Sequence, residues 1–129
     1  MTVNVLDTMR ALATKGEVVT LKAGDVLFTS GETGISMYGI LEGSIRLNWI
    51  GEDGKEGHED IQAGHVFGAG ALVMEDHQRL GTAKAAEDCR LIEMNREKFL
   101  FAMQEAPMFA IELLASVDER LRDIKLAST

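Results

Sequence analysis

Residues 67–85, FGAGALVMEDHQRLGTAKA, place a cluster of glycines ahead of a single arginine, Arg79. Binding a phosphate-sized anion requires closely spaced N–H donors and usually one cation. Glycines let the backbone approach the anion, and the first turn of a helix presents free amides at the positive end of its dipole. The stretch therefore predicts an anion site. A glycine-rich loop beside a solvated arginine is the alternative interpretation, because short glycine clusters alone are a weak signal.

The candidate site divides into a loop, a cation and a hydroxyl. The loop would supply backbone amides or allow close approach, and its residues are Phe67, Gly68, Ala69, Gly70, Ala71 and Leu72. Arg79 would hold the anion through two parallel hydrogen bonds. Thr82 would support the anion or approach the rest of the ligand. Leu80 and Gly81 lie between these two side chains and complete the site.

Short segments separated by glycine turns would position this site. Between about residues 17 and 94 they are EVVTLK, DVLFTS, ISMYGIL, SIRLNWI, HEDI and RLIEM. In SIRLNWI the residues Ile45, Leu47 and Trp49 alternate with polar ones, which is the period of a strand. An Ala-Gly-x-Val pattern occurs twice, in LKAGDVLF at 21–28 and IQAGHVFG at 61–68, and each copy places a turn before a strand or loop. Many short strands in a small chain predict an antiparallel, jelly-roll-like β-roll.

Helical patterns flank the predicted roll. Apolar residues recur at helical spacing, namely Val5, Leu6, Met9 and Leu12, and Gly16 is expected to end this helix. After Asn95 we expect a helix over 95–104 and a second over 107–125, with Pro107 in its first turn. No linker or low-complexity segment divides the chain. The sequence thus predicts one domain over residues 1–129, mainly β with one N-terminal and two C-terminal helices.

The second C-terminal helix carries an apolar row with 3-4-3 spacing, made of Leu114, Val117, Leu121 and Ile124. Such a row can pack against the roll of its own chain. It can also form the seam of a homodimer through helix 107–125. Both interpretations hold if they concern different faces of the helix.

Charge and composition exclude several classes of protein. The 129 residues include 21 acidic against 13 basic side chains, for a net charge of −8, which argues against binding of DNA or RNA by this chain alone. No apolar run is long enough to cross a membrane, and the N-terminus lacks the pattern of a signal peptide. The single cysteine, Cys89, fits a reducing compartment, so a cytoplasmic location is expected.

Several pieces of the chain resemble the cyclic nucleotide-binding domain family, best known from the catabolite activator protein and the regulatory subunits of protein kinase A. The pieces occur in family order over roughly residues 17–125 and are LKAGDVLFTSGE, SMYGILEGSIRL, DGKE, AGHVFG, RLGTAKA and DCRLIEMNREKF. The resemblance implies a β-roll flanked by helices. It also implies a phosphate-binding cassette in which Arg79 contacts the cyclic phosphate, and a C-terminal helix that covers the base.

The resemblance has two departures within the cassette. Phe67, Gly68, Ala71 and Leu72 match the family pattern, as do Thr82, Lys84 and Ala85 in the strand that follows. Gly81 replaces a usual alanine, and Ala69 stands where the family has a glutamate that accepts the ribose 2′-hydroxyl. A hydrogen bond to a charged group contributes about 1.5–3 kcal/mol, so its loss predicts roughly ten- to hundred-fold weaker binding. Glu75 or Asp76 in the adjoining loop is a candidate replacement.

The resemblance implies a non-catalytic regulatory domain for a 3′,5′-cyclic mononucleotide, with cAMP favoured over cGMP by family default. Ligand would order the cassette and reposition the C-terminal helices, which would act on an unidentified effector protein. The alternative from another class is a degenerate fold that binds no ligand and serves protein interaction or dimerisation.

Other candidate chemistry is weaker, and no enzyme activity, cofactor or metal is expected. His58, Glu59 and His65 suggest a cupin-like metal site, but the His-x-His pair of such sites is missing. His77 in the cassette loop is a remote candidate for haem binding, and a solvated side chain is the simpler interpretation. Cys89 is expected to be a buried, inert thiol, with Arg90 on the opposite face of its strand.

Overall fold

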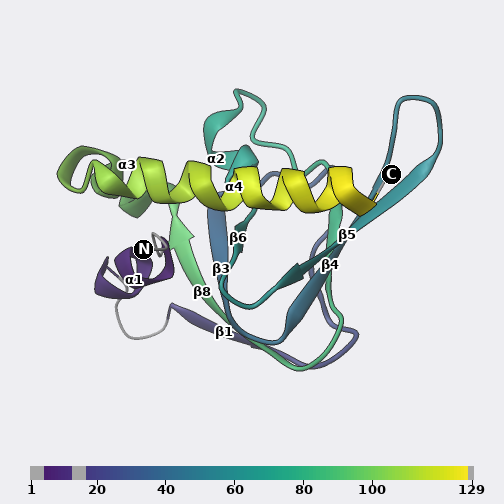
Figure 1. The fold of residues 1–129 in the computed structure, drawn as a ribbon, viewed down its shortest axis with the longest axis horizontal. Coiled ribbons are helices and arrows are strands. Elements are labelled where there is room, and N and C mark those ends of the chain that lie inside the picture. Colours follow the sequence, from purple (N-terminus) through teal and green to yellow (C-terminus); the bar gives the residue numbers. More distant parts are fainter. Residues whose placement is uncertain (1–4, 13–16, 128–129) are drawn as a thin grey trace.

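The computed structural model describes residues 5–12 and 17–127 and has the predicted order of one helix, a β-roll and two helices (Figure 1). The helices are α1 (Val5–Leu12), α2 (Gly70–Val73), α3 (Arg96–Glu105) and α4 (Met108–Ala127). The strands are β1 (Val18–Leu21), β2 (Val26–Phe28), β3 (Ser36–Glu42), β4 (Ser44–Ile50), β5 (Glu56–Gln62), β6 (Val66–Phe67), β7 (Thr82–Ala85) and β8 (Cys89–Asn95).

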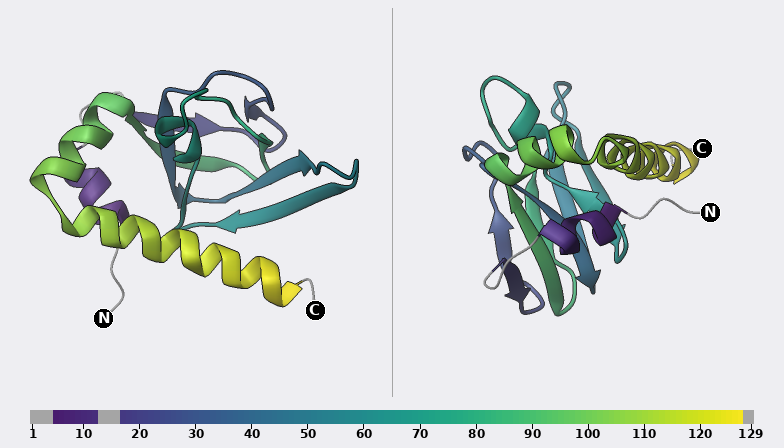
Figure 2. Two further views of the ribbon diagram at one scale, coloured as in Figure 1. Left: turned by 90° about the horizontal axis from the view of Figure 1, so that it is seen from above. Right: turned by 90° about the vertical axis from the view of Figure 1, so that its left-hand side faces the viewer.

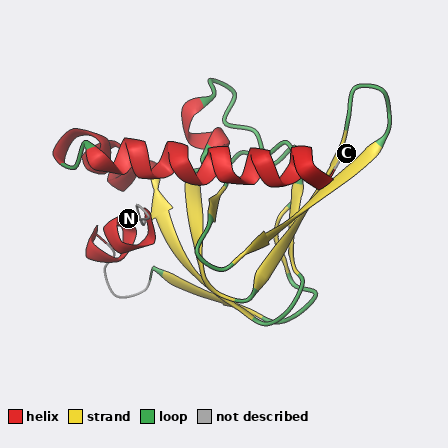
Figure 3. Cartoon of the chain, viewed as in Figure 1, coloured by secondary structure: helices red, strands yellow, loops and turns green. Residues whose placement is uncertain are grey.

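The strands form two four-stranded sheets in which every neighbouring pair is antiparallel. One sheet has the order β1-β8-β3-β6 and the other the order β2-β7-β4-β5. The two sheets curl toward each other as an open roll (Figure 3). The predicted antiparallel β-roll with flanking helices is therefore confirmed. The cassette, which we define as residues 67–82, lies between β6 of the first sheet and β7 of the second.

Strand periodicity explains how β4 divides its side chains between the interior and solvent. Ile45 is fully buried, Leu47 is partly buried, and Ile50 at the end of the strand is exposed. Ile45 lies opposite Ala85, and Leu47 lies opposite Ala83, in the neighbouring strand β7. Small residues on β7 leave room inside the roll for the larger side chains of β4.

The repeated Ala-Gly-x-Val pattern marks two equivalent turns. Gly24 and Gly64 have φ values of +92° and +98°, in the left-handed region that side chains other than glycine's rarely adopt. Each turn immediately precedes a strand, β2 in the first case and β6 in the second. The second turn therefore sets where the chain enters the cassette.

The core consists of two clusters on either side of the sheet that contains β3 and β8. The roll cluster includes Phe28, Tyr38 and Phe67, whose rings lie 5.6–6.3 Å apart. The helix cluster packs residues of α1, α3 and α4 against the outer face of that sheet, and its largest fully buried member is Phe109. Figure 2 shows α4 extending past α1 and α3 along one side of the roll.

The C-terminal helices lie within one or two residues of their predicted bounds. Asn95 precedes α3 and its side chain accepts a 2.9 Å hydrogen bond from the backbone N–H of Lys98, so it caps the helix. Pro107 immediately precedes α4. Glu112 of α4 accepts a 2.8 Å hydrogen bond from the hydroxyl of Thr8, which ties α4 to α1. The predicted stop at Gly16 lies outside the described residues.

The structure differs from the sequence analysis at β6, for which no separate strand was predicted. This strand has only two residues, and a pair of residues carries no periodicity. Within the described part of the chain, no single helix is long and apolar enough to span a membrane. The pair α3 and α4 reaches that length and composition only when counted together, across a bend of 116°.

Candidate functional site

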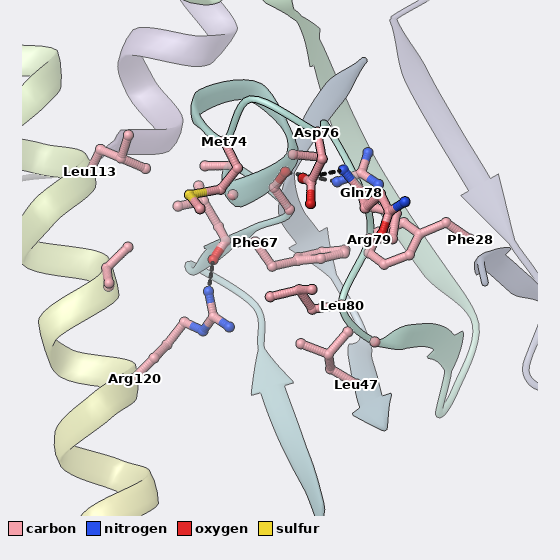
Figure 4. A pocket seen from close by; sticks show the side chains of 17 residues that line it. Phe28, Leu47, Phe67, Met74, Asp76, Gln78, Arg79, Leu80, Leu113 and Arg120 are labelled. Atoms are coloured by element: carbon pink, nitrogen blue, oxygen red, sulfur yellow. Dashed lines mark hydrogen bonds between the residues drawn. The ribbon is translucent and has the colours of Figure 1, made fainter. Parts of the chain in front are cut away.

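A cavity of about 320 Å³ opens between the cassette and α4 (Figure 4). Most of the predicted site residues line it, namely Phe67, Gly68, Ala69, Gly70, Ala71, Arg79, Leu80 and Gly81. Figure 4 shows Leu113 and Arg120 on the α4 side, Arg79 and Phe28 on the opposite side, and Phe67 between them. The fold thus brings the glycine cluster and the arginine together, as their spacing suggested.

Two predicted site residues do not face this cavity. Leu72 is buried in the helix cluster, with 3% of its surface exposed. Thr82 begins β7, and its hydroxyl accepts a 3.0 Å hydrogen bond from the backbone N–H of Ser30. Thr82 therefore fixes the neighbouring loop in the structure rather than bordering the cavity.

Further lining residues come from segments distant in sequence. From the roll and the cassette loop they are Phe28, Leu47, Val66, Met74, Asp76 and Gln78, and from α4 they are Leu113, Val117 and Arg120. Val117 belongs to the apolar row noted in the sequence. Arg120 carried no signal, because its type and spacing match the solvated charges beside it on the helix.

The side chain of Arg79 is enclosed by the backbone of neighbouring loops. Its Nη1 donates to the carbonyl oxygen of Gly68 at 2.7 Å, and its Nη2 donates to that of Ser36 at 2.5 Å. The guanidinium carbon lies 4.2 Å from the centre of the Phe28 ring, within the range of a cation–π interaction. A side chain at Gly34 would collide with the guanidinium, so this glycine makes room for the arginine.

Arg79 is a nearly buried cation without a carboxylate partner. Only 5% of its surface is exposed, and burial lowers its pKa from the ordinary value while nearby Tyr38, Glu32 and Glu93 oppose that change. None of the ion pairs among the described residues includes Arg79. Removing a cation from water is unfavourable unless charge and hydrogen bonds compensate. An anion in the cavity would supply the missing charge.

The short helix α2 begins beside Arg79. Ala69 stands at its N-terminal end and makes no side-chain capping hydrogen bond, and the first turn contains no acidic residue. The amides of Gly70 and Ala71 belong to this first turn, where no earlier carbonyl of the helix can accept from them. A side chain at Gly70 would meet nothing within 4 Å. Both residues line the cavity, so their amides are candidates for binding an acceptor there.

Of the two candidate replacements for the missing glutamate, only Asp76 borders the cavity. It is the one carboxylate among the lining residues, and its Oδ1 accepts a 3.1 Å hydrogen bond from the N–H of Gln78. The intervening His77 has φ = +54°, unusual for a residue with a side chain. Its Nδ1 lies 2.8 Å from the carbonyl oxygen of Ala71, and its own carbonyl accepts from Gly34. These bonds fix the loop that presents Asp76.

The other chemical candidates lie apart from one another. His58 is on β5, His65 contacts Ser116 and Glu119 of α4, and His77 lies in the cassette loop. In the described part of the chain, no three His, Cys, Asp or Glu side chains gather closely enough to hold a metal. Cys89 is buried as expected, and burial raises the pKa of its thiol. Arg90 points outward to Glu42, also as expected.

Comparisons with known proteins identify the family and the fold. The model of the family described as "Cyclic nucleotide-binding domain" matches residues 18–106. The chain is 30% identical to the cyclic AMP receptor protein of Thermus thermophilus over 104 residues, which is 80% of this chain and 48% of that protein. It is also 30% identical to lysophospholipase NTE1 of Pyricularia oryzae over 113 residues, 84% of this chain and 7% of that protein.

The fold of this chain is also similar to a solved structure. The crystal structure of the Thermus thermophilus catabolite activator protein superposes with a TM-score of 0.75 at 26% identity, over 95% of this chain and 56% of the other. The chain therefore spans about half the length of the bacterial relatives and a small part of the fungal one.

Proposed function

The chain belongs to the cyclic nucleotide-binding domain family, and from this premise we propose that its cavity binds a 3′,5′-cyclic mononucleotide, with cAMP preferred over cGMP. The observation that carries the proposal is Arg79, a nearly buried guanidinium in the cavity wall without an ion-pair partner among the described residues. The similarity to a cyclic AMP receptor protein supports cAMP as the ligand.

The cavity offers different chemistry to the two halves of such a ligand. The cyclic phosphate would lie between Arg79 and the first-turn amides of Gly70 and Ala71, which complement one negative charge. The base would lie against the apolar part of the lining, where α4 contributes Leu113 and Val117. These two side chains are our candidates for the helix residues that cover the base.

We propose that the domain is regulatory and non-catalytic. Among the described residues, the lining includes no hydroxyl, thiol, amine or imidazole side chain, and most of it is apolar. Ligand would shift the population of cassette conformations, and α4, which forms one wall of the cavity, would respond. A cytoplasmic location and an effector protein outside this chain complete the proposal.

A second function, dimerisation through α4, is supported by the outward face of that helix. Ile111, Leu114 and Leu121 are exposed by 54%, 67% and 48%. Single exposed apolar residues are ordinary, but a row of them along a helix is typical of an interaction surface. This surface would serve a homodimer of a ligand-binding domain, and it would remain the main function if the cavity binds nothing.

Calorimetric titration with cAMP and with cGMP tests the proposed ligand. We expect wild type to bind cAMP more tightly than cGMP. We expect Arg79→Lys to weaken binding about ten- to hundred-fold, because a lysine keeps the charge but loses the planar fork of donors. Arg46→Lys is the matched control, since Arg46 lies on β4 in an exposed pair with Asp60. If neither nucleotide binds the wild-type protein, dimerisation through α4 is the one proposed function that remains.

A further inference from the structure

We propose that Ser116 and Arg120 of α4 are positioning residues that transmit the occupancy of the cavity to α4 through the peptide groups of Val66. The inference rests on the cyclic-nucleotide function proposed above and names how that site would be coupled to the helix. We call the contacts of Ser116 and Arg120 with Val66 the Val66 clamp.

The clamp begins with an edge strand. β6 pairs with β3 only, through Tyr38 opposite Phe67 and Gly39 opposite Val66, and it is the last strand of its sheet. An edge strand has a row of backbone N–H and C=O groups that form no hydrogen bonds with a neighbouring strand. Here α4 takes both groups of Val66. Its N–H donates to the hydroxyl of Ser116 at 3.4 Å, a weak bond, and its carbonyl accepts from Nη1 of Arg120 at 2.9 Å.

Arg120 also forms an ion pair with Glu59. Its Nε and Nη2 donate to the two carboxylate oxygens of Glu59 at 2.7 and 2.8 Å, the parallel geometry that makes an arginine–carboxylate pair strong. The side chains are 18% and 9% exposed, so solvent screens the pair only in part. Because Glu59 lies on β5 of the second sheet, Arg120 joins α4 to both sheets at the cavity.

The clamp is continuous with the anion site. Val66 is followed by Phe67, whose buried ring stacks on Tyr38, and then by Gly68, whose carbonyl accepts from Arg79. A phosphate that draws Nη1 of Arg79 away from Gly68 would release that carbonyl and change the segment 66–68. Any displacement of Val66 then stretches its bonds to Ser116 and Arg120, which belong to α4.

A purely structural role, in which α4 only covers the edge of β6, makes a different prediction. Removing such a cover would speed exchange of the Val66 amide but would leave the response of α4 to ligand intact. A coupling role requires that response to weaken. The distinguishing quantity is therefore the difference in exchange of α4 amides with and without nucleotide.

The experiment combines calorimetry with hydrogen exchange of α4, using cAMP as the probe. Calorimetry first establishes the concentration that saturates each protein. We expect the cAMP-induced change in α4 exchange to fall at least about twofold in Ser116→Ala and about fivefold in Arg120→Met, in line with the loss of a weak and a charged hydrogen bond. Ser116→Thr keeps the hydroxyl and should retain the wild-type response.

Arg122→Met is the matched control on the same helix. Arg122 pairs with Asp118 one turn away and its side chain is 74% exposed, so its loss should leave the response of α4 unchanged. An unaltered response in both Ser116→Ala and Arg120→Met, or an equal loss in Arg122→Met, would overturn the clamp. If wild type binds cAMP without any change in α4 exchange, the clamp fails while the proposed ligand stands. If wild type binds neither cAMP nor cGMP, both fail.

Discussion

At the scale of single residues, the proposed site depends on a cation that the fold buries, Arg79. Arg79 contacts two carbonyl groups and an aromatic ring, which are neutral partners, while Glu32 and Glu93 act on its charge without forming an ion pair with it. Arg120, by contrast, forms an ion pair with the carboxylate of Glu59. The contrast between the two arginines is the physical argument for an anionic ligand.

The missing acid at position 69 gives a first prediction at this scale. In Ala69→Glu we expect cAMP to bind about ten- to hundred-fold more tightly, because a carboxylate would accept a hydrogen bond from the ribose hydroxyl. Calorimetry measures the change. The same variant should gain nothing with 2′-deoxy-cAMP, and an equal gain with both ligands would contradict the assigned role.

Asp76 gives a second prediction, because its carboxylate lines the cavity and could replace the family glutamate that is missing at position 69. If its free oxygen accepts from the ribose, wild type should bind cAMP roughly ten-fold better than 2′-deoxy-cAMP, and Asp76→Asn should remove most of that difference. The comparison of two ligands on one variant separates a specific contact from a general loss of the loop. Glu75→Gln is the control, because Glu75 does not line the cavity.

Part of this site could be predicted from the sequence, and part of it could not. Arg79 and the glycine cluster lie within one stretch, so local spacing was enough to bring them together. Arg120 lies 61 positions from Glu59 and 54 from Val66, and no local pattern distinguishes it from its charged neighbours. Leu72 matched the family pattern yet turned into the core, because a short helix must bury one of its faces.

At the scale of elements, α4 has two faces to which we assign proposed functions. The inward face packs Phe109 and Leu113 and makes the contacts of the Val66 clamp. The outward face exposes Leu114 and Leu121. The predicted 3-4-3 row is thereby divided, since Val117 turns to the cavity while its neighbours in the row turn to solvent. Both interpretations of that row were left open by the sequence, because spacing alone does not say what covers each face.

The outward face gives a third prediction. In Leu114→Glu we expect the dimer to dissociate at least ten-fold more readily, because a charge would be buried in an apolar seam. Light scattering across a dilution series measures the dissociation constant. Ile50→Glu is the matched control, since Ile50 is 72% exposed at the end of β4 and lies outside that helix face. A wild-type protein that stays monomeric throughout would contradict the proposed seam.

At the scale of the whole molecule, strand alternation and glycine turns were sufficient to predict an antiparallel roll, and helical spacing placed the flanking helices. How the strands, the cassette and the helices pack against one another was not predictable, because this packing depends on contacts between residues far apart in sequence. Tyr38 illustrates this. It belongs to the roll cluster, and the centre of its ring lies 5.8 Å from the guanidinium carbon of Arg79. Its hydroxyl donates a hydrogen bond to Glu93 of β8.

Tyr38 gives a fourth prediction, about the pH dependence of the folded state. Burial, reinforced by the charge of Glu93, raises the pKa of Tyr38 from 10.0 to about 12. A group whose pKa is raised on folding contributes stability below its unfolded value, so stability should fall as the pH rises from about 10 to about 12. As this is the single tyrosine, the ultraviolet absorbance of its phenolate follows the titration without interference. Denaturant should return the midpoint to near 10, and a native midpoint there would contradict the burial.

The absent side chain at Gly34 has a practical consequence for studies in living cells. The guanidinium of Arg79 occupies the space where a methyl group would stand at Gly34, although the two positions lie on different loops. We expect Gly34→Ala to displace the Arg79 guanidinium while leaving the identities of the residues that line the cavity and of the outward face of α4 unchanged. Such an allele would separate the proposed ligand binding from the proposed dimerisation, and its phenotype would show which of the two a cell requires.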